Sequence, residues 1–165
     1  MENVSGRLKH LPLLLLAVTT IACDQATKHL ARSRLVGEAR HSYLGDTIRL
    51  EYVENPGAFL GFGSALPAWA RKTVFTAGTG LILLVMVGAC MRGRWTVVER
   101  MAIGMAWAGG VSNLVDRLLH DKVSDFLNVG VGRLRTGIFN VADMAIVLAL
   151  LLIVSEHFWK RADLK

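Results

Sequence analysis

The stretch that decides the fold runs from Thr73 to Met91, TVFTAGTGLILLVMVGACM, and its nineteen residues carry no charge. A bilayer core of roughly 30 Å needs about 20 apolar residues in a helix. The whole chain agrees with this stretch, because 53% of its 165 residues are hydrophobic and only 19% are charged, against about 25% charged in an ordinary soluble domain. This composition excludes a disordered or collagen-like chain and favours one integral membrane domain over residues 1–165.

Three further apolar stretches extend the prediction to four membrane-spanning helices. One begins at Leu11, another runs from Met101 toward Asp116, and the last begins at Ile138. The chain is therefore predicted to be an all-α integral membrane protein with both ends on the same side of the bilayer. The expected spans cover residues 11–31, 72–91, 96–116 and 138–158.

The first stretch allows two interpretations. Leu11 to Cys23 is too short to cross a bilayer, and bases precede it, as in a cleaved signal; Ala22–Cys23 then resembles a lipoprotein cleavage site. In the other interpretation the helix continues to about residue 31, and Asp24 and Lys28 lie one turn apart and pair on one face. The three later spans favour the second, uncleaved interpretation.

The segments between the spans indicate the orientation and a small β region. Outer loops are expected at about residues 32–71 and 117–137, and Thr47 to Tyr52 alternates polar and apolar residues as a half-buried strand does. The net charge of +6 comes from bases that flank apolar runs, which is typical of membrane proteins rather than of nucleic-acid binding. Their higher density in the short inner segments predicts that both termini lie inside.

Charged and amide side chains gather at the outer ends of the predicted spans. Asn113 and Arg117 are four residues apart, and Asn140 and Asp143 are three apart, so each pair shares a helix face. Asp125 lies in the loop between these two spans. Because charges at membrane depth are costly, each of these residues is a candidate for function. Antiparallel packing of the spans would bring the faces together in one polar pocket.

The chemistry available in such a pocket is narrow. The five histidines are scattered, and the chain has neither a metal-binding HExxH motif nor a phosphate-binding loop, so we expect no metal and no cofactor. Two neighbouring aspartates share a proton, and one then activates water while the other protonates a carbonyl. Asp125 and Asp143 fit this role best. Spacing alone accounts equally well for a proton-coupled transporter.

Other polar residues have structural interpretations. Asp24 and Lys28 are expected to form an ion pair that holds the first span. Asp116, next to Arg117, is interpreted as a structural residue that pairs within its own span. The two cysteines, Cys23 and Cys90, are interpreted as small buried hydrophobic residues because both lie in apolar runs. The same interpretation excludes a disulfide framework.

Five segments, in this order, resemble the bacterial lipoprotein signal peptidase (signal peptidase II) family. One such pentapeptide is weak evidence, but five at compatible spacing are specific, and they extend from residue 24 to residue 143. The segments are Asp24-Gln25-Ala26-Thr27-Lys28, Glu54-Asn55-Pro56-Gly57-Ala58-Phe59, Gly109-Gly110-Val111-Ser112-Asn113-Leu114-Val115-Asp116-Arg117, Val123-Ser124-Asp125-Phe126 and Phe139-Asn140-Val141-Ala142-Asp143.

The resemblance implies a monomeric aspartyl peptidase of the bacterial inner membrane, with cytoplasmic termini and an active site near the periplasmic face. Its substrate would be a prolipoprotein whose cysteine carries a diacylglyceryl group, cut just before that cysteine, and globomycin-type compounds would inhibit it. By motif match, Asp125 and Asp143 become the catalytic pair. The residues expected to bind substrate or support the pair are Asn55, Gly57, Phe59, Asn113, Arg117, Asn140, Asp24 and Lys28.

Overall fold

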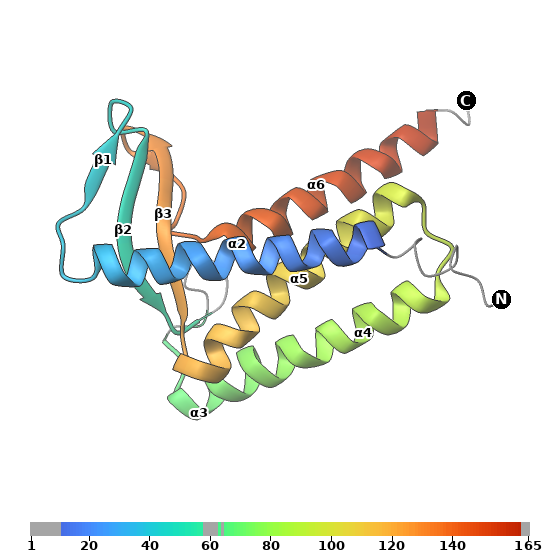
Figure 1. The fold of residues 1–165 in the computed structure, drawn as a ribbon, viewed down its shortest axis with the longest axis horizontal. Helices are drawn as coiled ribbons and strands as arrows, with labels where there is room; N and C mark the ends of the chain where they lie inside the picture. The colour runs from blue at the N-terminus through green and yellow to red at the C-terminus, as the bar shows by residue number, and fades with distance from the viewer. Residues whose placement is uncertain (1–10, 58–62, 64, 163–165) are drawn as a thin grey trace.

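The computed structural model describes residues 11–57, 63 and 65–162, and its long helices extend from one small sheet (Figure 1). A π-helical segment, Lys72–Ala77, joins helix α3 (Ala68–Arg71) to helix α4 (Gly78–Arg92), so that the three form one continuous rod. The described elements in chain order are α2 (Leu11–Leu35), β1 (His41–Tyr43), β2 (Ile48–Asn55), α3 (Ala68–Arg71), α4 (Gly78–Arg92), α5 (Val97–His120), β3 (Val123–Val131), β4 (Leu134–Arg135) and α6 (Val141–Ala162).

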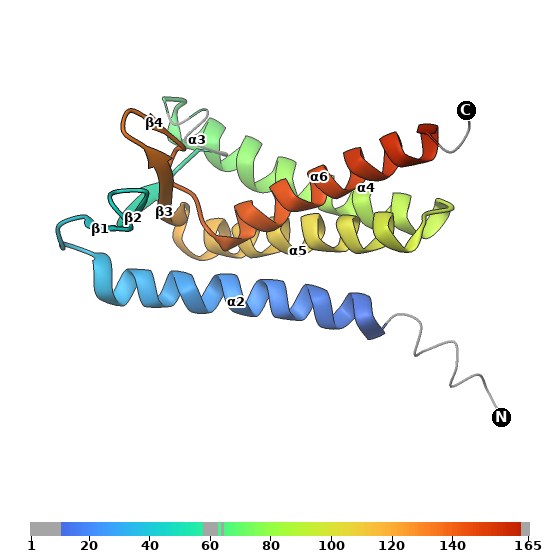
Figure 2. The same ribbon diagram turned by 90° about the horizontal axis from the view of Figure 1, so that it is seen from above.

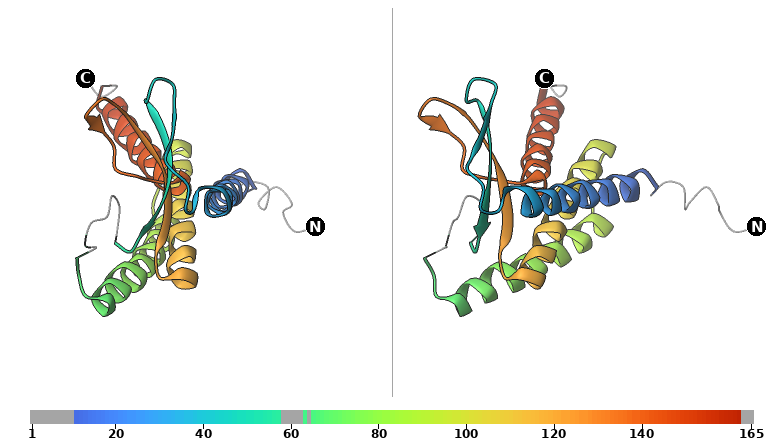
Figure 3. Two further views of the ribbon diagram at one scale, coloured as in Figure 1. Left: turned by 90° about the vertical axis from the view of Figure 1, so that its left-hand side faces the viewer. Right: turned by 60° about the vertical axis from the view of Figure 1, so that its left-hand side comes forward.

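Helix α5 is the centre of the helical layer and packs on α2, α4 and α6, as the two turned views show (Figures 2 and 3). It starts with a capping box, in which the Thr96 side chain accepts from the Glu99 N–H and the Glu99 side chain accepts from the Thr96 N–H. Gly109 lets α6 approach closely, since a Cβ there would lie 2.6 Å from the carbonyl oxygen of Ala142. Small residues at a helix contact are typical of packing between membrane helices.

The sheet is antiparallel, with strand order β1-β2-β3-β4. The predicted strand over Thr47 to Tyr52 is confirmed and continues as β2 to Asn55. Its partner β3 lies inside the segment 117–137, which the sequence predicted only as a loop. The register pairs Asn55 with Val123 at one end of the two strands, and it shifts once between Leu50 and Val53.

Phe139, two residues before α6, explains why the start of this helix differs from the prediction. We expected the last span to begin near residue 138, but the helix begins at Val141 because Phe139 pairs with Leu127 of β3. The Phe139 carbonyl accepts N–H bonds from both Phe126 and Leu127. The residues that enter α6 are thereby attached to the strand that carries Asp125.

Two helices in the described part of the chain are long and apolar enough to cross a bilayer, Ala68–Arg92 and Val141–Arg161. Helices α2 and α5, with 25 and 24 residues, are also long enough, but they carry buried charged residues. The molecule is mostly helical with a small antiparallel sheet, as expected, whereas the count of four spans stays a prediction. Helix α2 begins and α6 ends at the end of the molecule away from the sheet (Figure 1).

Candidate active site

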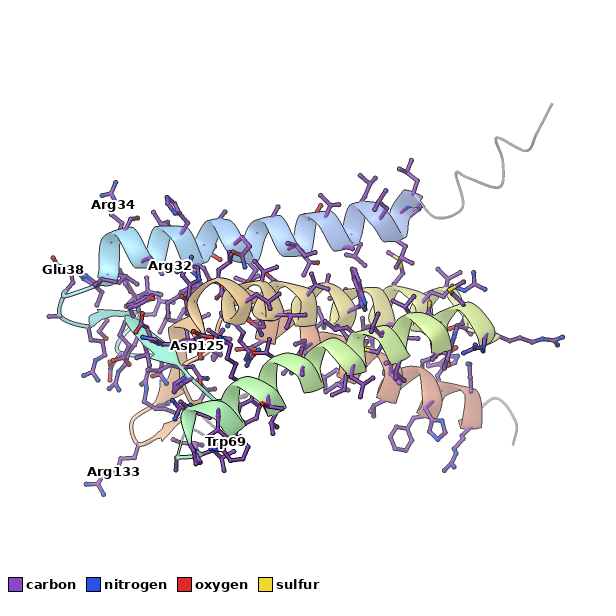
Figure 4. The ribbon with its side chains drawn as sticks, turned by 90° about the horizontal axis from the view of Figure 1, so that it is seen from below. Arg32, Arg34, Glu38, Trp69, Asp125 and Arg133 are labelled. Carbon is purple, nitrogen blue, oxygen red and sulfur yellow. The ribbon has the colours of Figure 1, made fainter. Side chains whose placement is uncertain are left out.

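Asp125 lies on β3 at the junction of the sheet and the helix ends (Figure 4). Its side chain is only 2% exposed. One carboxylate oxygen accepts from the Asn55 side-chain amide at 2.9 Å, and the other accepts from the Asn140 amide at 2.6 Å. β2 supplies Asn55 from the neighbouring strand, so the sheet itself brings this donor to Asp125.

Asp143 lies in the first turn of α6, where it takes part in the cap of the helix. Its N–H donates to the Asn140 side-chain oxygen at 2.9 Å, while its own carboxylate accepts from the Asn140 N–H at 3.3 Å. This reciprocal pair is the capping-box arrangement and satisfies two N–H groups at the helix start. The Asn113 amide of α5 donates to the other Asp143 oxygen at 2.9 Å.

Asn140 joins the two aspartates. Its side-chain amide donates to Asp125, while its backbone N–H and side-chain oxygen bind Asp143. Asn140 is fully buried, so neither set of bonds is shared with bulk solvent. The two acids that the sequence selected are therefore brought together around one residue that the sequence also selected.

Burial has a clear electrostatic effect on Asp125. Loss of solvation raises its pKa from 3.8 to about 6, and the negative charge of Asp143 acts in the same direction. The hydrogen bonds from Asn55 and Asn140 act in the opposite direction because they favour the ionised form. A carboxyl group that titrates near neutral pH is suited to exchanging protons with a substrate.

A buried cluster of charges lies behind the two acids. The Lys28 ammonium lies 2.7 Å from an Asp24 oxygen and 3.1 Å from an Asp116 oxygen, and all three side chains are fully buried. It also donates to the Asn113 oxygen at 2.8 Å. The predicted pair between Asp24 and Lys28 is confirmed.

The cluster holds both elements that carry the acids. The second Asp24 oxygen accepts from the Ala142 N–H at 2.8 Å, so it caps α6 from another helix. Asp116 accepts the Ser124 N–H at 3.1 Å, at the start of β3. The expected pairing of Asp116 within its own span is wrong, because its ionic partners are Lys28 and Arg32 of α2.

Arg117 connects α5 to the segment that follows β2. Its guanidinium donates to the Gly57 carbonyl at 2.9 Å, and the Gly57 N–H donates to the Asn55 side-chain oxygen at 3.0 Å. The Arg117 Nε–H is buried without a partner in the described part of the chain. Phe59, which the sequence also placed in the site, lies outside the described residues.

An apolar cavity of about 430 Å³ extends from Asp143 along α6. Its walls are mostly aliphatic and aromatic, and Asp143 is the first of the α6 residues that line it. The other lining residues are Thr136, Phe139, Met144, Val147, Leu148 and Leu151. The site therefore offers an acid pair next to a surface that fits an apolar chain.

Histidine, cysteine and acidic side chains are the ones that could hold a transition metal. Within the described ranges, no three histidine, cysteine or acidic side chains gather where they would hold a metal ion. Both cysteines are free, as expected. The prediction that both are buried is wrong, because Cys23 is exposed on α2 and Cys90 is partly exposed.

Three contributors to the site were not predicted. The Ser112 hydroxyl donates to Asp24 at 2.7 Å, Gln25 donates to Ser112, and Arg32 contacts both Ser124 and Asp116. Ser112 and Gln25 stand next to residues that were selected, and this adjacency was the available signal. Arg32 is one turn beyond Lys28 and shares its helix face.

Two buried acids held together between a helix and a small sheet are suited to the acid–base chemistry of an aspartic peptidase, and comparison with known proteins identifies the family. The profile of signal peptidase (SPase) II matches residues 16–159. The lipoprotein signal peptidase of Hydrogenovibrio crunogenus is 34% identical over 149 residues, 87% of this chain and 83% of that protein. The lipoprotein signal peptidase of Syntrophus aciditrophicus is 31% identical over 159 residues, which cover 92% of this chain and 97% of that protein.

The chain therefore belongs to the signal peptidase II family and is a peptidase. A solved bacterial membrane enzyme has the same fold, with a TM-score of 0.80 over 93% of this chain and 92% of the other, at 24% identity. A second solved bacterial membrane enzyme has a TM-score of 0.75 over 88% of this chain and 91% of the other, also at 24% identity. The resemblance found in the five sequence segments is confirmed at the level of family and fold.

Proposed function

We propose that this chain is a membrane aspartyl endopeptidase that removes the signal peptide from diacylglyceryl-modified prolipoproteins by cleaving just before the lipid-modified cysteine. The observation that carries the proposal is the joining of Asp125 and Asp143 through Asn140 in a member of a signal peptidase family. We expect the protein to act as a monomer.

The proposed reaction uses one protonated and one ionised carboxyl group. The ionised aspartate takes a proton from water, and the resulting hydroxide attacks the carbonyl carbon of the scissile peptide bond. The protonated aspartate donates its proton to the carbonyl oxygen. When the tetrahedral intermediate collapses, the C–N bond breaks, the leaving nitrogen receives the proton that the first aspartate took from water, and a hydroxyl of the intermediate returns a proton to the second aspartate. The products are the carboxyl end of the signal peptide and the free amino group of the lipid-modified cysteine.

The surroundings of the pair support this assignment. The pKa of about 6 at Asp125 places one group near the middle of the physiological range. Asn55 donates to Asp125, and Arg117, joined to Asn55 through Gly57, brings a positive charge near both acids. The apolar cavity beside Asp143 would take an apolar part of the lipid-modified substrate.

The arrangement of the helices and the sheet also supports a proposed placement in the membrane. Helices α2, α5 and α6 and the rod formed by α3 and α4 would cross the bacterial inner membrane. The sheet would lie at the periplasmic surface and both termini in the cytoplasm. The lipid-modified cysteine would then reach the acids while its acyl chains stay among the lipids. Globomycin-type inhibitors are expected to occupy the same site.

The test is cleavage of a lipid-modified precursor by the purified protein in liposomes, followed by gel shift. Wild type should cleave in the presence of EDTA and be blocked by globomycin, whereas Asp125→Asn and Asp143→Asn should not cleave although they insert and accumulate. Glu38→Gln, which removes an exposed carboxyl group, is the matched control and should cleave normally. Substantial cleavage by either asparagine variant, or solute flux without proteolysis, would overturn the proposal.

A further inference from the structure

Arg32 lies on α2 and reaches the beginning of the strand that carries Asp125. Its Nε–H donates to the Ser124 hydroxyl at 2.9 Å, and its Nη2 donates to an Asp116 oxygen at 2.8 Å. Its side chain is 26% exposed, whereas Asp116 is fully buried. In Figure 4, Arg32 is directed from α2 toward the interior, while its neighbour Arg34 is directed away.

Arg32, Asp116 and Ser124 are linked in a ring of hydrogen bonds. The second Asp116 oxygen accepts the Ser124 N–H at 3.1 Å, so Ser124 is held through its backbone and through its side chain. The Tyr52 hydroxyl lies 3.2 Å from the Ser124 hydroxyl. A guanidinium is suited to this role because its planar fork holds two acceptors at once, whereas an ammonium is a single point charge.

The position of Ser124 determines where Asp125 points. Successive side chains of a strand project to opposite faces. With Ser124 held toward α2, Asp125 projects to the other face, where the amides of Asn55 and Asn140 meet its two oxygens.

Arg32 also completes the charge balance of the buried cluster. Asp24, Asp116 and Lys28 alone sum to one negative charge, and Arg32 brings the sum to zero. An uncompensated buried charge is strongly destabilising and acts on neighbouring ionisable groups.

We propose that Arg32 is a positioning residue for peptide cleavage, which fixes Ser124 and thereby aims Asp125 at the scissile bond. This inference rests on the proposed function, in which Asp125 is catalytic. Arg32 does not touch the reacting atoms and acts through Ser124 and Asp116.

The test compares four variants by kcat and KM on a lipid-modified precursor across pH 5–8. Arg32→Gln should lower kcat roughly 10- to 100-fold with little change in KM, as expected for a misaligned reacting group. Arg32→Lys keeps the charge but not the fork and should recover only part of kcat. Ser124→Ala should lower kcat without a charge change. Arg34→Gln, two residues along the same helix with an exposed side chain, is the control and should match wild type.

The pH profile provides a readout that a purely structural role would not move. The charged groups around Asp125 are Asp143 from α6, Lys28 from α2 and Arg117 from α5. Asp24 and Asp116 contact Lys28, and on β2 Tyr52 contacts Ser124 while Glu54 is its partner in the strand register. Removing the Arg32 charge makes the acid pair harder to ionise, so Arg32→Gln should shift both limbs of the profile to higher pH. Arg32→Lys and Ser124→Ala should keep the wild-type limbs.

The outcomes separate this inference from the proposed function. If Arg32→Gln cleaves with wild-type kcat and pH profile, or loses only thermal stability, Arg32 is not a positioning residue. If Asp125→Asn, measured in the same series, still cleaves, the proposed function itself fails whatever the Arg32 variants do. If Arg32→Gln does not fold, the kcat values of Arg32→Lys and Ser124→Ala decide the question. Wild-type kcat in both variants would overturn the inference.

Discussion

Replacing Asp125 with asparagine is expected to abolish cleavage and, in the same protein, to change how stability depends on pH. The side chain is almost completely buried. Burial first of all, and then the charge of Asp143, raises its pKa from 3.8 to about 6. The acid is therefore held in an environment that disfavours its ionised form, although two amides donate to that form.

Whether stability rises or falls with pH depends on which form of the chain, folded or unfolded, releases the Asp125 proton at the lower pH. Between pH 3.8 and about 6 the unfolded chain has released the Asp125 proton while the folded chain keeps it, so rising pH favours unfolding. The contribution to stability is complete below pH 3.8 and is lost as the pH rises through about 6. At 1.36 kcal/mol for each pKa unit, the loss is about 3 kcal/mol.

Thermal unfolding of wild type and Asp125→Asn in the same detergent, from pH 4 to pH 7.5, measures this loss. Relative to the variant, wild type should lose roughly 6–12 °C in Tm across the range, since about 1 kcal/mol corresponds to 2–4 °C at this chain length. Glu38→Gln, which removes an exposed carboxyl group, should follow wild type at every pH. A constant difference in Tm between wild type and Asp125→Asn would refute the reasoning.

Three further substitutions test the packing and the cluster. Asp116→Asn should lower the free energy of unfolding by roughly 3–5 kcal/mol, because two cations then share one carboxylate fewer; unchanged denaturant unfolding would contradict the ion-pair account. Asn140→Ala should lower kcat by at least about tenfold and stability by about 1 kcal/mol, because it removes a donor to one acid and the cap of α6; wild-type kinetics would disprove its joining role. Gly109→Ala places a Cβ 2.6 Å from the Ala142 carbonyl oxygen and should lower Tm more than Gly110→Ala, which meets only a flexible leucine side chain; equal Tm values would argue against close helix contact.

Helical spacing is the part of the site that could be predicted from the sequence. Asp24 and Lys28, four residues apart, form the expected buried pair. Asn140 and Asp143, three apart, meet as predicted, although Asn140 precedes α6 and bonds Asp143 as a cap rather than from the same helix face. Short-range periodicity fixes such pairs without knowledge of the rest of the fold.

Contacts between distant segments could not be predicted in the same way. Strand β3 contains Gly130 and follows no clean alternation, and it is a strand because β2, some 70 residues earlier, pairs with it. The partner of Asp116 was missed for a similar reason, because Arg32 is 84 residues away on another helix. Sequence spacing reports neighbours on one helix and carries no information about which helix packs beside it.

The fully buried ammonium of Lys28 has a consequence for the biogenesis of the protein. Under the proposed topology, α2 emerges from the ribosome before α5, with an acid and a base in its second half, and either charge alone in lipid would oppose stable insertion. Part of the compensation comes from Asn113 and Asp116 on α5, and Asn113 is synthesised 85 residues later. Helix α2 is thus expected to stay at the insertion machinery until α5 arrives, so that the two enter the bilayer as a pair.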